Sequence, residues 1–341
     1  MLDWPRMLRP SIIVCAGTDL FHSFFPPVLQ RRLSRLSRWQ RAGSTELTSA
    51  LRRKLGSADA LVTTWDSPAF PEDLPKLAPK LRFIAHCGGE VKSRFARSLF
   101  NRLTICNAPE PMALATAEMG AALLAYCARN IDFYRDALRT RSNRIYEDLH
   151  LHGAPESLIG REIGMIGFGR IGRALVDLLR GFDLRWRVYD PYASRSLTKK
   201  YPIRFVGLDA VLSEAHLLVL TAALTEETRG LLNRSRLSRL PDGATIINIA
   251  RGGLIDLPAL TREIKRKRLR CALDVTDPPE PLPLTHPLRT LAGAIVTPHI
   301  AGSNRRVRHE IAEVVLDEIE NFFRHRKVKN RVTTTMLDRM T

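Results

Sequence analysis

The sequence of 341 residues lacks the features that mark several large classes of protein. Its five cysteines stand singly, with no Cys-x-x-Cys pair, so neither a zinc knuckle nor a disulfide framework is indicated, and a reducing compartment fits. The apolar run near the start, residues 11–16, is too short for the core of a signal peptide, and no later run approaches a membrane span. These absences predict a soluble, cytoplasmic protein without a metal site.

Acidic residues are scarce relative to basic ones. The chain has 35 Asp and Glu against 53 Lys and Arg, a formal net charge of +18, which suits nucleic acid, an anionic surface or anionic small molecules as partners. The basic clusters, residues 31–41, 262–270 and 322–331, lie far apart and are not interleaved with aromatic residues that stack on single strands. We therefore expect solvated helix faces or exposed ends, and no membrane or specific nucleic-acid partner.

The sequence does have a regular alternation of short apolar runs with segments of helical periodicity. Such alternation predicts an α/β protein with parallel sheets, and the length exceeds that of one hydrophobic core, so two domains are expected. Long helices are predicted at residues 111–141 and 303–326. The first is rich in small and apolar residues, which predicts close helix packing in a two-fold dimer.

The stretch "EIGMIGFGRIGRALVDLLRGF" places Gly167, Gly169 and Gly172 in a G-x-G-x-x-G spacing. An apolar run precedes these glycines, and a helical pattern follows them and ends at Gly181, a plausible C-cap. A strand, a tight turn and a helix put backbone N–H groups where a pyrophosphate can bind, although a plain glycine turn has the same spacing. Asp190, 18 residues after Gly172, is the acid that the motif predicts for ribose hydroxyls, which favours NAD over NADP.

Polar side chains follow three predicted strands of the same sheet, where ligands of open parallel sheets bind. They are Arg251 in "TIINIARGG", Asp274 and Glu280 in "CALDVTDPPEP", and His299 in "AIVTPHIAG". Hydride transfer to a 2-oxo acid uses such groups, because arginine binds a carboxylate, histidine donates a proton and glutamate orients and charges the histidine. Taken singly, each residue has an ordinary structural alternative. Arg251 could belong to a surface ion pair, and Asp274 could cap the loop that follows it. Glu280 could be a solvated acid in a loop, and His299 a histidine of the core.

With these motifs the sequence resembles the NAD-dependent D-2-hydroxyacid dehydrogenases, which include glyoxylate/hydroxypyruvate reductases and phosphoglycerate dehydrogenases. The resemblance extends over residues 60–303 and rests on several segments in the family's order, which is more specific than the glycine motif alone. These segments are "GMIGFGRIG" with "YDP", "LTEETRGLLN", "GATIINIARGGLID", "ALDV" followed by "EPLP" and "HPL", and "VTPHIAG".

The resemblance implies a particular domain organisation. A Rossmann domain that binds NAD, residues 107–301, is expected to be inserted into a flavodoxin-like substrate domain, residues 1–106 and 302–341. Each domain should be a doubly wound parallel sheet, with a small anionic 2-oxo or 2-hydroxy acid bound in the cleft between them. The resemblance also implies a homodimer.

The resemblance further implies a role for each site residue. Arg251 becomes the substrate arginine, His299 the acid/base and Glu280 its partner, while backbone N–H groups around Gly88 and Gly89 bind the substrate carboxylate. Asp274 is expected near the nicotinamide amide. The residues expected at the cofactor are Gly167, Gly169, Arg170, Ile171, Gly172, Asp190, Thr221, Ala250, Arg251 and Asp274.

Three departures from the family pattern concern the expected site. Residues 221–223 read Thr-Ala-Ala where the family commonly has His-x-Pro, and "DPPEP" contains one extra proline beside the acid. The substrate loop carries Glu90, which is unfavourable for an anionic substrate unless it points away or pairs with Lys92 or Arg94. The sequence therefore leaves the substrate's identity open.

Three functions are compatible with these observations. The first is an NAD-dependent reductase or dehydrogenase of small 2-hydroxy acids. The second is a dinucleotide-sensing corepressor-like protein on the same scaffold, because a fold does not fix a function. The third, a basic nucleic-acid binder, depends on charge alone. The ordered set of motifs favours the first.

Overall fold

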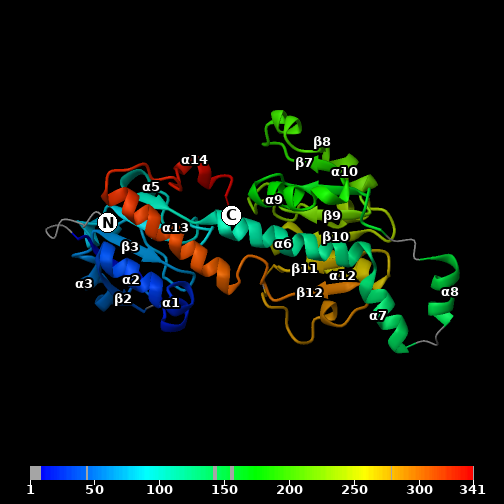
Figure 1. The fold of residues 1–341 in the computed structure, drawn as a ribbon, viewed down its shortest axis with the longest axis horizontal. Helices are drawn as coiled ribbons and strands as arrows, with labels where there is room; N and C mark the ends of the chain where they lie inside the picture. The colour runs from blue at the N-terminus through cyan, green and yellow to red at the C-terminus, as the bar shows by residue number, and fades with distance from the viewer. Residues whose placement is uncertain (1–8, 44, 141–143, 154–156, 278, 341) are drawn as a thin grey trace. The chain divides into compact units, whose positions relative to one another are not determined.

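In a computed structural model of the chain, two compact units are described (Figure 1). The structure describes residues 9–340 apart from 44, 141–143, 154–156 and 278. Unit 1 comprises Met1–Met112 and Ser303–Thr341, and unit 2 comprises Ala113–Gly302. The predicted boundaries between the domains fall after residues 106 and 301, whereas the two units divide after residues 112 and 302. Each unit contains one parallel sheet flanked by helices, which confirms the predicted α/β fold.

The sheet of unit 1 has the strand order β2-β1-β3-β4-β5, which is the flavodoxin order. Every residue of β3 and β4 is buried, as expected for parallel strands covered on both faces. The strands are β1 (Ser11–Cys15), β2 (Arg38–Ala42), β3 (Ala60–Thr63), β4 (Phe83–His86) and β5 (Thr104–Cys106).

Helices cover both faces of this sheet. On one face α13 packs against β4, α1 and α2, and on the other α3, α4, α5 and α14 contribute leucines to a common core. The helices are α1 (Thr18–Phe24), α2 (Pro27–Leu36), α3 (Ser49–Leu55), α4 (Leu74–Leu77), α5 (Leu99–Arg102), α13 (Arg305–Phe323) and α14 (Thr334–Leu337). The helix predicted at residues 303–326 is α13, which begins after Asn304, whose side chain accepts a hydrogen bond from Val307 N.

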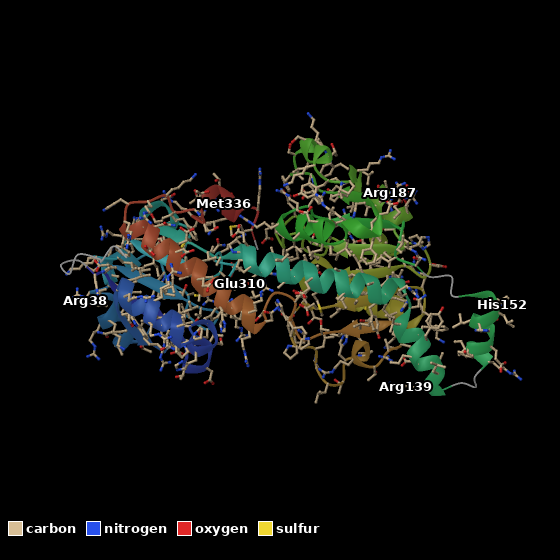
Figure 2. The ribbon with its side chains drawn as sticks, in the orientation of Figure 1. Arg38, Arg139, His152, Arg187, Glu310 and Met336 are labelled. Carbon is tan, nitrogen blue, oxygen red and sulfur yellow. The ribbon has the colours of Figure 1, made fainter. Side chains whose placement is uncertain are left out.

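The sheet of unit 2 has seven parallel strands in the order β12-β11-β10-β9-β6-β7-β8. The order reverses between β6 and β9, so the sheet is doubly wound with its switch point beside the glycine motif. The strands are β6 (Glu162–Ile166), β7 (Arg185–Tyr189), β8 (Ile203–Phe205), β9 (Leu217–Leu220), β10 (Thr245–Asn248), β11 (Arg270–Leu273) and β12 (Ala294–Val296). Arg187 on β7, labelled in Figure 2, pairs with Glu162 at the start of β6. The distance between Nε and Oε1 is 2.5 Å.

Two sets of helices cover the faces of this second sheet. Side chains of α6 and α9 share one buried core with the sheet, and those of α10, α11 and α12 share the other. The helices are α6 (Pro109–Ala128), α7 (Ile131–Thr140), α8 (Arg144–His152), α9 (Arg170–Leu178), α10 (Leu208–Glu214), α11 (Arg234–Leu237) and α12 (Leu257–Lys265).

Three local predictions differ from the structure. The helix predicted at residues 111–141 is broken into α6 and α7 at Asn130, whose φ of 47° is a left-handed conformation that asparagine tolerates. Gly181 is not the C-cap of α9, because that helix ends at Leu178 and Gly181 lies in a following 3-10 turn. The basic cluster at residues 31–41 contains the edge strand β2 as well as the end of α2.

The helix α6 is unusually apolar for its length. Among the described residues it alone is long and apolar enough, by length and composition, to cross a bilayer, whereas the sequence analysis expected no run of this kind. Half of its most apolar window is buried inside the protein, as in the core helix of a folded domain.

All five cysteines are free and buried, and burial raises the pKa of Cys127 and of Cys271 to about 12.

Candidate active site

The three glycines after β6 serve three different physical purposes. Gly167 has a φ of 91°, and a Cβ there would lie 2.5 Å from the backbone of Ala222. Gly172 lies in the first turn of α9, where a Cβ would lie 3.0 Å from the carbonyl oxygen of Gly167. A Cβ on Gly169 would meet no atom within 4 Å. The first and third glycines therefore permit a tight turn and close packing, and the second leaves space at the start of α9.

This open space fits a dinucleotide phosphate. Gly169 is the N-cap of α9, and Arg170 and Ile171 form its first turn, so N–H groups and the positive end of the helix dipole face the space that the missing side chain leaves. Backbone approach to the pyrophosphate is the role of the second glycine in such motifs. Gly169 leaves room for this approach, because a Cβ on it would meet no protein atom within 4 Å.

Gly169→Ala should weaken NADH binding by at least about tenfold and leave the melting temperature unchanged, because the new methyl group enters the phosphate space and no protein atom. NADH titration and thermal unfolding would measure both quantities. Gly207→Ala is the matched control, because Gly207 is the N-cap of α10 and a Cβ there also meets nothing within 4 Å. Equal NADH affinity in the two variants would exclude the phosphate assignment.

Thr221 connects the end of β9 to the glycine turn. Its Oγ1 donates a hydrogen bond of 2.6 Å to the carbonyl oxygen of Gly167, and its N–H donates to the carbonyl oxygen of Ile166. The Thr-Ala-Ala departure from the family pattern thus supplies a buried hydroxyl that fixes the turn and an Ala222 backbone close enough to exclude any side chain at Gly167. Sequence reasoning named Thr221 but not this contact.

Asp190 follows β7 and holds the same turn from the other side. Its Oδ2 accepts a hydrogen bond from Phe168 N at 2.7 Å, and its Oδ1 accepts from Tyr192 N and Ala193 N. A carboxylate offers about four lone-pair sites, so three backbone donors leave about one for a ligand hydroxyl. Asp190 is therefore both a structural clamp of the glycine turn and a candidate ribose ligand.

Arg251 follows β10 in a turn whose next residue, Gly252, has no room for a side chain. Asn248 orders this turn, since its side chain accepts a hydrogen bond from Ala250 N and donates one to the carbonyl oxygen of Arg251. The next residue, Gly252, touches the loop after β11, because a Cβ on it would lie 1.9 Å from the carbonyl carbon of Thr276. The turn that carries Arg251 and the loop that leads to Glu280 are thus in backbone contact.

Glu280 and His299 form a pair. The Nδ1 of His299 lies 3.1 Å from Oε2 of Glu280, and the other oxygen, Oε1, accepts a hydrogen bond from Thr276 N at 3.1 Å. Both side chains are partly exposed. Because Nδ1 faces the carboxylate, Nε2 is the nitrogen that can exchange a proton with a ligand. The extra proline of "DPPEP" does not prevent this pairing, although Pro278 lies outside the described residues.

Asp274 lies at the end of β11 and is fully buried. Its Oδ1 accepts hydrogen bonds from Thr297 Oγ1 at 2.6 Å and from Ile300 N, and its Oδ2 accepts from Ala301 N. The carbonyl oxygen of the same residue accepts from His299 N. Asp274 therefore holds the turn in which His299 has a φ of 54°, a positioning role that sequence reasoning did not identify.

The substrate loop predicted at residues 88–90 lies in unit 1 after β4. Gly88 N–H donates to the carbonyl oxygen of His86, so this bond must be exchanged if Gly88 is to bind a ligand carboxylate. A Cβ on Gly88 would lie 2.7 Å from Trp65 Nε1, which explains the glycine. Glu90 accepts hydrogen bonds from Ser93 N and Ser93 Oγ, so its charge is directed into its own turn.

Behind this loop lies a buried neutral histidine. His86 Nδ1 is 2.9 Å from Thr63 Oγ1, and burial together with the charge of Arg94 lowers the pKa of His86 to about 3. At neutral pH this imidazole is uncharged and supports the loop by its packing and its hydrogen bond. The guanidinium of Arg94 donates to the carbonyl oxygens of Ser67 and Trp65.

Comparison with known proteins identifies the second unit. Residues 121–301 match the family model for the D-isomer specific 2-hydroxyacid dehydrogenase, NAD binding domain, which agrees with the predicted cofactor. The chain is 28% identical over 263 residues to a D-3-phosphoglycerate dehydrogenase of Archaeoglobus fulgidus, covering 76% of this chain and 49% of that protein. It is 30% identical to a hydroxypyruvate reductase of Thermotoga maritima, covering 72% and 80% respectively.

The structure agrees with these matches. A phosphoglycerate oxidoreductase from Rhizobium etli has a TM-score of 0.74 and 26% identity, covering 95% of this chain and 98% of that chain. The chain spans about half the length of the D-3-phosphoglycerate dehydrogenases that it matches. The ordered motifs, the two parallel sheets and the family model lead to one conclusion: the chain belongs to the D-isomer specific 2-hydroxyacid dehydrogenase family.

Proposed function

We propose that this protein reduces small 2-oxo acids to D-2-hydroxy acids with NADH, and catalyses the reverse oxidation with NAD. The observation that carries the proposal is the His299–Glu280 pair, which lies at the edge of the sheet that also carries the glycine turn. A proton donor and a dinucleotide site on one rigid sheet are the two requirements of this chemistry. The proposed domain roles are NAD binding by residues 107–301 and substrate binding by residues 1–106 and 302–341.

The roles of this chain's residues follow from their chemistry. The guanidinium of Arg251 binds the substrate carboxylate with two parallel hydrogen bonds, and backbone N–H groups of the Gly88–Gly89 loop bind it as well. His299 donates the proton on Nε2 to the carbonyl oxygen of the substrate as that oxygen becomes an alkoxide. Glu280 holds the ring through Nδ1 and stabilises the imidazolium. The nicotinamide, when bound, supplies the hydride.

A substrate panel tests this proposal. NADH oxidation would be followed with glyoxylate, hydroxypyruvate, phenylpyruvate and 2-oxoisocaproate at matched concentrations. Turnover with at least one of them supports the enzyme. NADH binding without turnover on any of them would contradict it and favour the dinucleotide-sensing alternative.

Cofactor choice follows from Asp190. A 2′-phosphate would meet the carboxylate of Asp190, which already accepts three backbone hydrogen bonds, so we expect kcat/KM to be higher with NADH than with NADPH. Arg195, the basic residue five positions on, lies with its guanidinium 4.4 Å from the centre of the Phe205 ring. Steady-state kinetics with both cofactors measure the preference. Equal kcat/KM values would overturn the assignment of Asp190 as the residue that selects NADH, and would make Arg195 the candidate phosphate ligand.

We also propose a cytoplasmic homodimer. Apolar side chains of α6 and of the following helices are exposed, including Leu114, Ile131 and Phe133, which is the composition of a covered surface. Light scattering at micromolar concentration should give twice the monomer mass. A monomeric mass would contradict the dimer and leave the proposed chemistry untouched.

A further inference from the structure

A cavity of about 660 Å³ opens at the amino ends of the strands in unit 2. It lies at the edge of the sheet opposite to the glycine turn, because Arg161, which lines it, precedes β6 and Gly167 follows β6. The five residues of β6 separate these two edges by about 16 Å. Small-molecule sites commonly have volumes of about 300–1,000 Å³. The cavity is therefore large enough for a ligand and separate from the proposed active site.

Thr245, the first residue of β10, brings a polar group to this cavity. It shares a face of the sheet with Ile247, which belongs to the core beneath α6, and the residue is only 3% exposed. Within the described part of the chain its hydroxyl makes no hydrogen bond, yet the oxygen is not sealed from solvent, so it opens into the cavity. An unpaired hydroxyl in so buried a place is unfavourable, which calls for a partner in the cavity.

The cavity also holds two arginines without a counter-ion. Arg161 and Arg185 both line it, and the backbone N–H of Arg185 donates to the carbonyl oxygen of Arg161 at 2.9 Å, so the two residues are neighbours. Neither guanidinium forms an ion pair or a hydrogen bond with a residue that the structure describes. Like charges at the starts of neighbouring strands repel each other. An anion placed between them would relieve this repulsion.

The other charged groups that line the cavity are already paired. Its two carboxylates, Glu162 and Glu214, both pair with Arg187, at 2.5 and 2.6 Å (Figure 2). The third arginine of the lining, Arg270, pairs with Asp132 at 2.6 Å. This arginine also lies near the carboxyl end of α6, where it offsets the partial negative charge of the helix terminus. The charge that remains in the cavity is therefore positive.

We propose that this cavity binds a small organic anion, a carboxylate or phosphate compound, through the guanidinium groups of Arg161 and Arg185 and the hydroxyl of Thr245. These residues lie at the amino ends of β6, β7 and β10, and in the strand order β10-β9-β6-β7 the neighbours are about 4.8 Å apart. One ligand in a cavity of this size can contact all three. Arginine suits such a ligand because its guanidinium donates two parallel hydrogen bonds to a carboxylate or a phosphate.

Titration calorimetry with citrate, glycerol 3-phosphate and inorganic phosphate tests the proposal. The protein would carry Arg251→Gln and be saturated with NADH, so that neither the proposed substrate arginine nor the glycine turn is free to bind a probe. At least one probe should bind, and the tighter of the two organic probes identifies carboxylate or phosphate as the preferred group. Adding Arg161→Gln and Arg185→Gln together should weaken its binding at least about tenfold. Thr245→Val, which keeps the shape and removes the hydroxyl, should weaken it about three- to tenfold.

Arg204→Gln is the matched control. Arg204 is an exposed arginine of β8 in the same unit and does not line the cavity, so its loss should leave the affinity within about twofold. Melting temperatures would show that each variant is folded. Unchanged affinity in the Arg161→Gln, Arg185→Gln protein would overturn the proposal, as would no binding of any probe at millimolar concentration. An equal loss in Arg204→Gln would mean only general attraction to a basic protein, which also overturns it. Turnover is not measured, so these outcomes are independent of the proposed function.

Discussion

His299→Asn should lower turnover by about 10²- to 10⁴-fold and leave NADH affinity and the melting temperature unchanged. The loss follows from removing the group that we propose donates a proton to the carbonyl oxygen. Asparagine is the suitable replacement because His299 has a φ of 54°, and asparagine tolerates this left-handed conformation better than most residues. Its amide can also hydrogen-bond to Glu280 but cannot donate a proton to an alkoxide.

His286→Asn is the matched control in the same unit. His286 Nδ1 accepts a hydrogen bond from Leu288 N at the start of a short 3-10 turn, and an asparagine oxygen can serve the same function. Turnover, the dissociation constant of NADH and the melting temperature would be measured for both variants. Near-normal turnover in a folded His299→Asn protein would remove His299 from the mechanism.

Gly252→Ala should lower kcat/KM by at least about 100-fold, because displacements of about 1 Å in a catalytic group have effects of this size. The new Cβ would lie 1.9 Å from the carbonyl carbon of Thr276 and 2.0 Å from Asp277 N, so backbone must move. That movement displaces the turn of Arg251 or the loop whose Thr276 N–H binds Glu280, and either change separates groups that we propose act together. We also expect the free energy of unfolding to fall by about 1–3 kcal/mol.

The control for this variant is again Gly207→Ala, where the added methyl group meets no atom. Steady-state kinetics and denaturant unfolding would be measured side by side. If Gly252→Ala kept full activity, the backbone contact between the two loops would have no part in positioning Arg251 and Glu280.

The fold could be predicted from sequence because its signals are local. Apolar runs such as residues 217–220 and 245–248 become fully buried strands, and the glycine turn lies between β6 and α9 as predicted. The edge strand β2 was missed because its exposed arginines resemble a solvated helix face, and its pairing with β1 depends on residues distant in sequence. Edge strands carry a weak apolar signal for this reason.

The site could be predicted only as a set of residues. Strand ends indicated Arg251, Glu280 and His299, and the structure places Glu280 and His299 in hydrogen-bond contact. The supporting contacts could not be predicted, because they join loops that are neighbours only after folding. Asp274 holding the His299 turn and Thr221 holding the glycine turn are contacts of this kind.

The most direct test of the proposed chemistry is to follow deuterium from NADH labelled at C4 of the nicotinamide into the product. The enzyme is expected to transfer hydride from one face of the nicotinamide only, so the two diastereomers of the labelled NADH would be supplied in separate reactions. The 2-oxo acid would be the best of hydroxypyruvate, phenylpyruvate and 2-oxoisocaproate, because the product of glyoxylate is neither D nor L. Direct hydride transfer predicts that one diastereomer gives a D-2-hydroxy acid with deuterium on C2, formed in equal amount to the NAD produced. An L-product, or an unlabelled product from both diastereomers, would contradict the account.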